Sequence, residues 1–304
     1  MRPRDLLPCL LALALGCAGE DFEPPSRVNG PRLLAVVATP PVVAPGDDVR
    51  LVPFAAGPDG AADVTVAFEV DLSPRALATA AGQESLFDEG DPIALEPDGD
   101  GAVLDGADTE AAIERVLALV GDAGPGTDEH VVRLVYETVG LVLRVRVTMR
   151  DAEGEVLVEG FKRVLLMPEP EAADNPPPPR VRVGETWLSA RGAGDPFRCA
   201  PEAAGAPEVA AGAEVTFAPE PDEGWLETYP ALDLDGRLVE GTENAYYSWF
   251  ATGGDFTLDV TRAPDREVTW TAPDAAGTVP FWLVVRDGHL GTSACRAEVS
   301  VVAP

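Results

Sequence analysis

The sequence has almost no lysine: Lys162 is the only one, and arginine carries nearly all of the positive charge. The 22 basic residues are outnumbered by 52 acidic ones, which gives a formal net charge of -30 at pH 7. Such a chain repels phosphate backbones and anionic lipid headgroups. Nucleic acid is therefore not expected as a partner.

Histidine is almost as scarce, with His130 and His289 alone. The chain has no His-Glu-x-x-His, no Cys-x-x-Cys, no P-loop and no dinucleotide fingerprint. The run 291–295 approaches a nucleophile elbow but has Cys295 where the second glycine is needed. We expect no enzymatic activity and no cofactor. A hydrolase with paired carboxylates is an alternative, because acidic residues occur throughout the chain.

Long apolar runs are missing as well. The longest one near the start, 6–15, is too short to span a bilayer, which takes about 20 helical residues. It follows Arg2 and Arg4 and precedes Gly16, as in a secretory signal with a small residue at the cut. The sequence therefore predicts a signal peptide over 1–16 and a mature chain that begins at Cys17.

Residues 13–17, Leu-Ala-Leu-Gly-Cys, resemble a bacterial lipobox. This resemblance implies acylation of Cys17 and anchoring to a membrane of the bacterial cell envelope, with the outer membrane as the expected site. The match departs from the usual order, because Ala14 stands three residues before the cysteine where leucine is usual. A plain secretory signal, cut by an ordinary signal peptidase, is the alternative.

Glycine and proline number 30 each, which favours many turns and few long helices. Four consecutive prolines mark the clearest boundary and favour an extended, semi-rigid spacer. The expected parts are a tether over 17–30, a first domain over 31–167, a Pro-rich linker over 168–180 and a second domain over 181–304.

Alternation of apolar and polar residues predicts half-buried strands in the first domain. The residues expected to face inward are Val64, Val66, Phe68 and Val70 in one strand and Leu143, Val145, Val147 and Met149 in another. A partner strand follows a turn at 151–154, with a bulge expected at Gly160. On the outer face Arg144, Arg146 and Arg150 are expected to meet Glu155 and Glu159, and an anionic partner for these arginines is the alternative.

An insertion is expected at about 73–139. Residues 108–121 show helical spacing through Ile113, Val116, Leu117 and Val120, with Asp108 as the cap and Gly121 as the end. The run 128–140 suits either a strand or a short helix.

The second domain has short apolar segments between Gly, Pro and Asp turns, which is typical of a β-sandwich. The segments "YSWFATGG", "TWTAPDAAGTVPFWLVVRDG" and "ACRAEVSVV" resemble the last strands of bacterial immunoglobulin-like, cadherin-like or polycystic-kidney-disease-type domains. "LLAVVATPPVVAPGDDVRL" resembles the first two strands of an immunoglobulin-like domain in surface lipoproteins. The resemblance implies a mainly β chain of two β-sandwiches and a place in the cell envelope, but no activity.

Four cysteines are present, and Cys9 falls in the segment expected to be removed. Cys295 shares a strand face with Ala297, Val299 and Val301, and Cys199 shares one with Phe197. Two inward-facing cysteines in an exported β-domain predict a Cys199–Cys295 disulfide. Two free buried thiols are the alternative.

One weaker pattern points to a bound cation. Asp98, Asp100, Asp105 and Asp108 cluster in one short run, but an EF-hand would need Gly at Val103 and Glu at Thr109. A looser Ca²⁺ site is one interpretation, and solvated turn residues are the other.

All five tryptophans lie in the second domain, where Trp249 and Trp270 suit the core. Trp225, in a turn-rich stretch, is the candidate for contact with a glycan. The sequence as a whole predicts a non-enzymatic, lipid-anchored envelope protein with an unknown protein or glycan partner. A calcium- or carbohydrate-binding surface module is the alternative.

Overall fold

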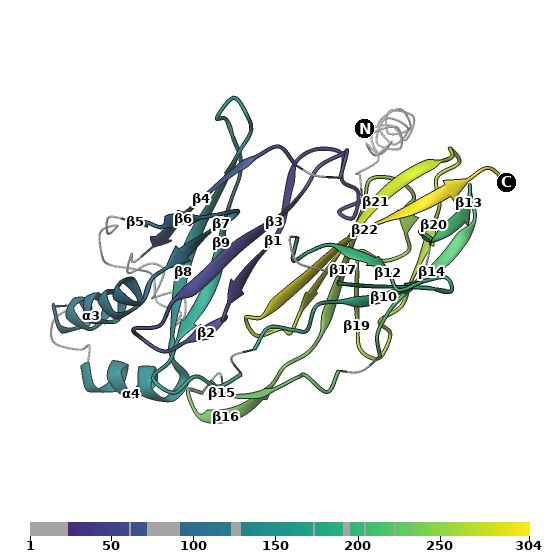
Figure 1. Ribbon diagram of the computed structural model, residues 1–304. Coiled ribbons are helices and arrows are strands. Elements are labelled where there is room, and N and C mark those ends of the chain that lie inside the picture. Colours follow the sequence, from purple (N-terminus) through teal and green to yellow (C-terminus); the bar gives the residue numbers. More distant parts are fainter. Residues whose placement is uncertain are drawn as a thin grey trace, which may run out of the picture.

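The computed structural model describes residues 24–60, 62–71, 92–122, 129–172, 174–190, 195–203, 205–221, 223–233 and 235–304. The expected signal peptide and Cys17 lie outside these residues. The described chain is mainly β and forms two β-sandwiches side by side, with helices α3 (Gly106–Asp122) and α4 (Glu129–Val139) beside the first (Figure 1). In the described residues, neither helix is long and apolar enough to cross a membrane.

The first sandwich has the strand connectivity of immunoglobulin-like domains. One sheet has the order β1-β3-β7-β6 and the other β2-β9-β8-β4-β5, so the strands take the A-B-E-D and C-F-G places. The strands are β1 (Arg32–Thr39), β2 (Val42–Val43), β3 (Val49–Ala56), β4 (Thr65–Asp71), β5 (Ile93–Ala94), β6 (Glu96–Asp98), β7 (Gly101–Leu104), β8 (Leu141–Arg150) and β9 (Val156–Leu166).

Alternation placed the core of this sandwich correctly. The inward residues expected in β8 are all buried, as are Phe68 and Val70 in β4, while Val64 and Val66 are partly buried. The bulge expected at Gly160 is wrong, because Gly160 pairs regularly with Val147. The register between β8 and β9 shifts instead at Met149/Arg150. The register shifts there because the adjoining turn at 151–155 closes the hairpin.

Part of the expected insertion belongs to the sandwich itself. Strands β5, β6 and β7 fall inside 73–139 and belong to the two sheets, while α3 and α4, the helices of the described residues, stand outside them. The cap of α3 is Asp105 and not Asp108, because Asp105 Oδ1 accepts a hydrogen bond from the Asp108 amide at 2.8 Å. The ambiguous run forms the helix α4 over Glu129–Val139, and the next residue, Gly140, has a φ of +78° that suits the position after a helix C-terminus.

The second sandwich contains the same core arrangement of strands, with β11 and β12 added at one edge. Its sheets have the orders β12-β11-β10-β14-β20-β18 and β13-β22-β21-β17-β19, which again contain A-B-E-D and C-F-G. The strands are β10 (Arg180–Val183), β11 (Thr186–Ala190), β12 (Cys199–Pro201), β13 (Glu208–Ala210), β14 (Glu214–Pro219), β15 (Thr228–Leu232), β16 (Leu238–Thr242), β17 (Tyr246–Ala251), β18 (Asp255–Phe256), β19 (Val260–Arg262), β20 (Val268–Thr271), β21 (Gly277–Arg286) and β22 (Thr292–Val302).

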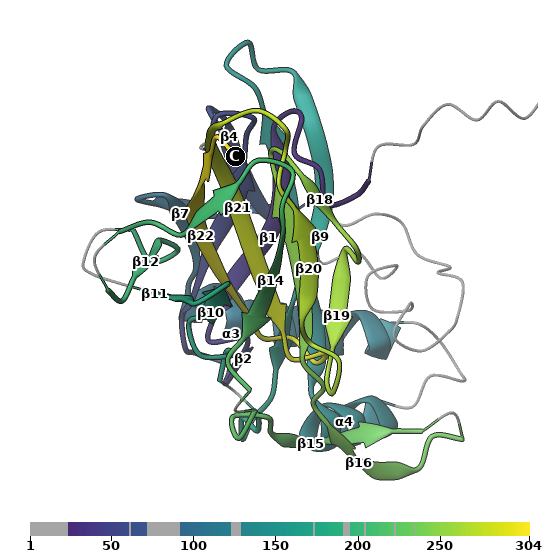
Figure 2. The ribbon, with the colours of Figure 1, turned by 90° about the vertical axis from the view of Figure 1, so that its right-hand side faces the viewer.

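Aromatic side chains fill the second core. Trp249, Trp270 and Phe217 are almost completely buried, and the Phe217 ring meets the edges of both indoles. The hairpin β15–β16 leaves this sandwich and contacts α4 of the first (Figure 2).

The two sandwiches are docked through the outer faces of their sheets, which is a correction to the expected spacer. The apolar residues buried between them are Val28, Leu34, Ala35, Phe54, Ala56, Trp282, Val284 and Ala294. The linker follows this contact: Asn175 Nδ2 donates to the carbonyl of Ala38 at 2.7 Å, and Asn175 Oδ1 accepts from the amide of Thr292 at 2.8 Å. Burial of both sheets' outer faces therefore brings the two sandwiches into contact, and the linker does not hold them apart.

The expected tether over 17–30 also needs correction at its end. The amide of Ala251 donates to the carbonyl of Ser26, and the amide of Val28 donates to the carbonyl of Ala251, both at 2.9 Å. Arg27 adds an ion pair with Asp255 at 2.7 Å. The chain from Ser26 onward is thus attached to the second sandwich and is not free.

Candidate functional site: a cleft between the sandwiches

The expected disulfide is present. Cys199 in β12 and Cys295 in β22 are bonded, with Cα atoms 5.6 Å apart. Both residues are buried, at 4% and 0% exposure. The bond joins the β11–β12 strand pair to β22, the last strand, as the inward-facing pattern predicted.

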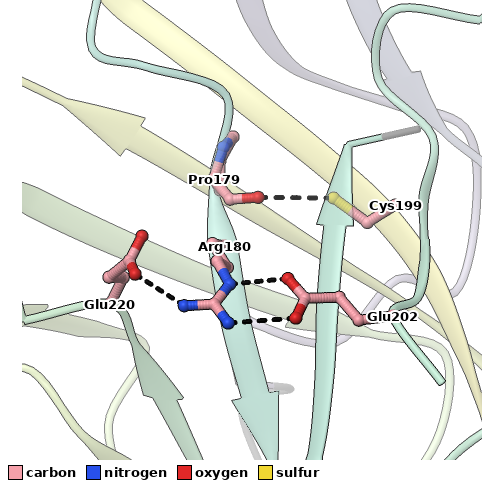
Figure 3. A network of polar contacts seen from close by, with 5 residues as sticks. All are labelled: Pro179, Arg180, Cys199, Glu202 and Glu220. Carbon is pink, nitrogen blue, oxygen red and sulfur yellow. Dashed lines mark hydrogen bonds and ion pairs between the residues drawn. The ribbon is translucent and has the colours of Figure 1, made fainter. Parts of the chain in front are cut away.

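A polar network next to the disulfide fixes the start of the second sandwich (Figure 3). Arg180 binds both carboxylate oxygens of Glu202, at 2.6 and 3.0 Å, and reaches Glu220 at 2.6 Å. These two carboxylates raise the pKa of Arg180, since they stabilise its charged form. The carbonyl oxygen of Pro179 lies 3.6 Å from Cys199 Sγ. The linker's last residues are thereby held against β12 and β14.

The four aspartates of the expected Ca²⁺ cluster have other contacts. Asp98 and Asp100 form ion pairs with Arg50, at 3.0 and 2.8 Å. Asp105 caps α3, and burial with the nearby Asp105 charge raises the pKa of Asp108. Within the part of the chain that the structure describes, no three His, Cys, Asp or Glu side chains gather as metal ligands.

Trp225 is not a free aromatic platform. It is partly buried and packs against the core of the second sandwich. It lines a small pocket of about 80 Å³ with Tyr247 and the linker prolines 177–179.

The outer arginines of β8 have different partners from those expected. Arg146 faces Glu69 on β4 at 3.6 Å, Arg144 lies 3.9 Å above the ring of Phe161, and Arg150 donates to the carbonyl of Gly154. Glu159 stands opposite Thr148, because the register sets which side chains meet.

The chemically richest site is a cleft of about 510 Å³ between the two sandwiches, which the sequence did not reveal. The first sandwich contributes β1, with Leu33 to Val36, and β9, with Phe161 to Arg163. The second contributes Tyr246 and the turn from Arg286 to Thr292 between β21 and β22. Ligand sites occur preferentially at such domain interfaces.

Two cations hold the walls of this cleft together. Lys162 Nζ, from the first sandwich, donates to the carbonyl of Leu290 at 2.7 Å. In the opposite direction Arg286 donates to the carbonyl of Leu34 at 2.9 Å, and also to Ser248 Oγ. Each sandwich therefore places one positive charge on the other's backbone.

Burial shifts the pKa values of the cleft's side chains. Loss of water lowers the pKa of Lys162 to about 8, with Arg286 and Arg163 adding to the shift and Asp287 opposing it. Burial likewise lowers the pKa of His289 to about 4, so its ring is neutral at pH 7. Burial raises the pKa of Asp287, although the loop amide of His289 donates to its Oδ1 at 2.7 Å and opposes the shift.

A second buried acid lies near the cleft. Glu243 is 5% exposed, and loss of water raises its pKa to about 7, with the Asp287 and Glu227 charges adding to the shift. The amide of Glu227 donates to its Oε2 at 3.0 Å and opposes the shift. Tyr229 stacks on His289, with ring centroids 3.8 Å apart. Several titratable groups buried together often mark a functional site.

Sequence reasoning missed this site because it is made by docking. The solitary lysine was one available signal, since alternation counted back from the buried Val164 puts Lys162 on an inward position. The other was His289 in the Asp-Gly-His-Leu-Gly turn at 287–291.

Comparisons with protein-family models and with curated proteins give no match. Among solved structures, the D00-D0 domain of Intimin is 9% identical, covering 90% of this chain and 98% of that one, with a TM-score of 0.20. The Yersinia pseudotuberculosis adhesin InvE is 11% identical, covering 88% and 58%, with a TM-score of 0.21.

A nucleoside hydrolase-related hypothetical protein from Saccharophagus degradans is 17% identical over 43% of this chain, with a TM-score of 0.25. This chain spans about a quarter of that protein's length, 27%. At these scores the similarities carry no inference about activity, ligand or partner. The immunoglobulin-like fold follows from the chain's own strand connectivity.

Proposed function

We propose that this chain is a non-enzymatic binding protein of the bacterial cell envelope, anchored by lipid on Cys17. The observation that carries the proposal is the buried Cys199–Cys295 disulfide, because such bonds persist in oxidising compartments outside the cytoplasm. It agrees with the signal-like segment that ends at Gly16-Cys17.

The role of a binding protein is supported by the docked sandwiches. A buried apolar interface and reciprocal hydrogen bonds hold them together, and the cleft lies between them. A preformed cleft lowers the entropy cost of binding, and it is suited to recognition without any chemical step.

The hydrolase alternative has less support. Paired-carboxylate hydrolysis needs two acids facing one another across a substrate site. Among the described residues that line the cleft, Asp287 is the single acid, and Glu243 does not line it.

The test is the intact mass and detergent partitioning of the exported protein, wild type beside Cys17→Ser. We expect the wild type to start at Cys17, to carry acyl chains and to enter the detergent phase. The variant should stay in the aqueous phase. A wild-type chain that starts elsewhere and stays aqueous would overturn the anchoring.

A further inference from the structure

The cleft concentrates positive charge in a strongly acidic protein. Among the described residues that line it, Lys162, Arg163 and Arg286 are basic and Asp287 is the one acid, while the whole chain carries -30. His289 adds no charge at pH 7, since burial holds its pKa at about 4. The lining therefore has an excess of two positive charges.

None of these three cations forms a salt bridge within the described residues, although Arg27, Arg50, Arg180, Arg266 and Arg296 all do. Arg163 is exposed, and Arg286 and Lys162 donate to neutral oxygens. Positive charges held close to one another repel, and an anion bound between them offsets this repulsion. A bound anionic ligand would therefore explain why these three cations are gathered in one cleft.

The rest of the wall offers neutral contacts. β9 pairs with β2 only at Leu165 and Leu166, so its edge from 156 to 164 has no strand partner in the described chain. Such an edge presents backbone N–H and C=O groups to a ligand. Leu33 and Phe161 supply apolar surface beside them. The cleft therefore suits a small organic molecule with one charged group, because it offers cations for the charge and polar backbone groups and apolar side chains for the rest.

From these contacts we propose that the cleft binds a small ligand through an oxyanion, a carboxylate or a sulfate, held by Lys162, Arg163 and Arg286. Guanidinium groups suit such anions because they donate two parallel hydrogen bonds. The inference rests on the proposed binding function and specifies its site and ligand chemistry.

The test is thermal unfolding of the full exported chain with sodium sulfate, sodium glucuronate, glucose or sodium chloride, at matched ionic strength. We expect a saturable rise in Tm with sulfate or glucuronate and none with glucose or chloride. The stronger of the two anions identifies the oxyanion.

Arg163→Gln is the decisive variant. Arg163 is exposed and lowers the pKa of Lys162, so its removal leaves no unpaired buried group and should not lower the Tm of the free protein. Loss of a charge-assisted hydrogen bond should weaken anion binding about tenfold or more. Arg237→Gln is the matched control, because it removes the same charge at an exposed site outside the cleft and should leave binding unchanged.

The inference is overturned if neither anion raises the Tm, or if Arg163→Gln and Arg237→Gln respond alike. A chain that enters detergent but shows no anion-dependent Tm would refute the cleft's ligand and leave the envelope proposal standing.

Discussion

Glu243 is a carboxyl group that folding takes out of water, and this makes stability depend on pH. Its folded pKa of about 7 lies above the ordinary value of 4.5, so the folded state holds the proton more tightly. Below pH 4.5 the carboxyl group is protonated in the folded and the unfolded state, so it costs no stability. As the pH rises from 4.5 through 7, the unfolded state ionises more readily and the folded state loses stability. His289 acts in the opposite direction: its folded pKa of about 4 is below 6.5, so stability is lost as the pH falls from 6.5 to 4.

Glu243→Gln should therefore raise the Tm at pH 8 and have little effect at pH 4.5. The amide keeps the volume and an oxygen for the Glu227 amide but carries no charge. The gain at pH 8 is on the order of 3 kcal/mol, because folding raises the pKa of Glu243 from 4.5 to about 7. Unfolding of both proteins across this range measures it. Glu240→Gln, exposed on β16, controls for net charge, and an equal gain in both variants would contradict the argument.

At the scale of single residues, the sequence predicts what the strand period determines. Cys295 was placed among Ala297 and Val299 by alternation, and the disulfide followed from that placement. Lys162 could not be assigned a partner, because the carbonyl of Leu290 that it reaches is 128 residues away in the chain. A contact across two domains leaves no periodic signal in either one.

At the scale of elements, the disulfide adds a covalent link between the two sheets of the second sandwich. β12 is an edge strand of one sheet and β22 belongs to the other, and the bond closes a span of 96 residues. A loop of this length restricts the unfolded chain strongly.

Replacing both Cys199 and Cys295 by alanine should lower the free energy of unfolding by about 4 to 5 kcal/mol in the chain-entropy view. Urea unfolding with and without a reductant measures this difference. The reductant should destabilise the wild type and have no effect on the double variant. If the reductant acts equally on both proteins, the bond is not the source of the stability.

Long elements were more predictable than short ones. β4 and β8 have seven and ten residues, enough for alternation to show, and α3 has seventeen. β5, β6 and β7 have two to four residues each, and they lie in an acidic, turn-rich stretch with no clear period. They become strands because β3 and β4 offer open edges to pair with, which is a tertiary influence.

At the scale of the whole molecule, the composition of the linker was misleading. Proline-rich chain favours extension in isolation, but docking depends on the outer faces of β1, β3 and β21. A signal was present, because 33–37 and 281–285 are unbroken apolar runs. Strands that are buried on both faces show such runs.

Phe54→Ser tests whether this interface holds the two sandwiches together. Phe54 is 3% exposed and packs on Phe197 of the second sandwich, with ring centroids 4.8 Å apart. Its loss should cost about 3 kcal/mol or more at the interface. Small-angle scattering should then show a larger radius of gyration, and protease should cut the linker at 168–174 faster. Leu258→Ser, which is exposed and lies between β18 and β19 of the second sandwich, is the control and should change neither. Unchanged scattering with a lower Tm would instead confine the role of Phe54 to the first sandwich.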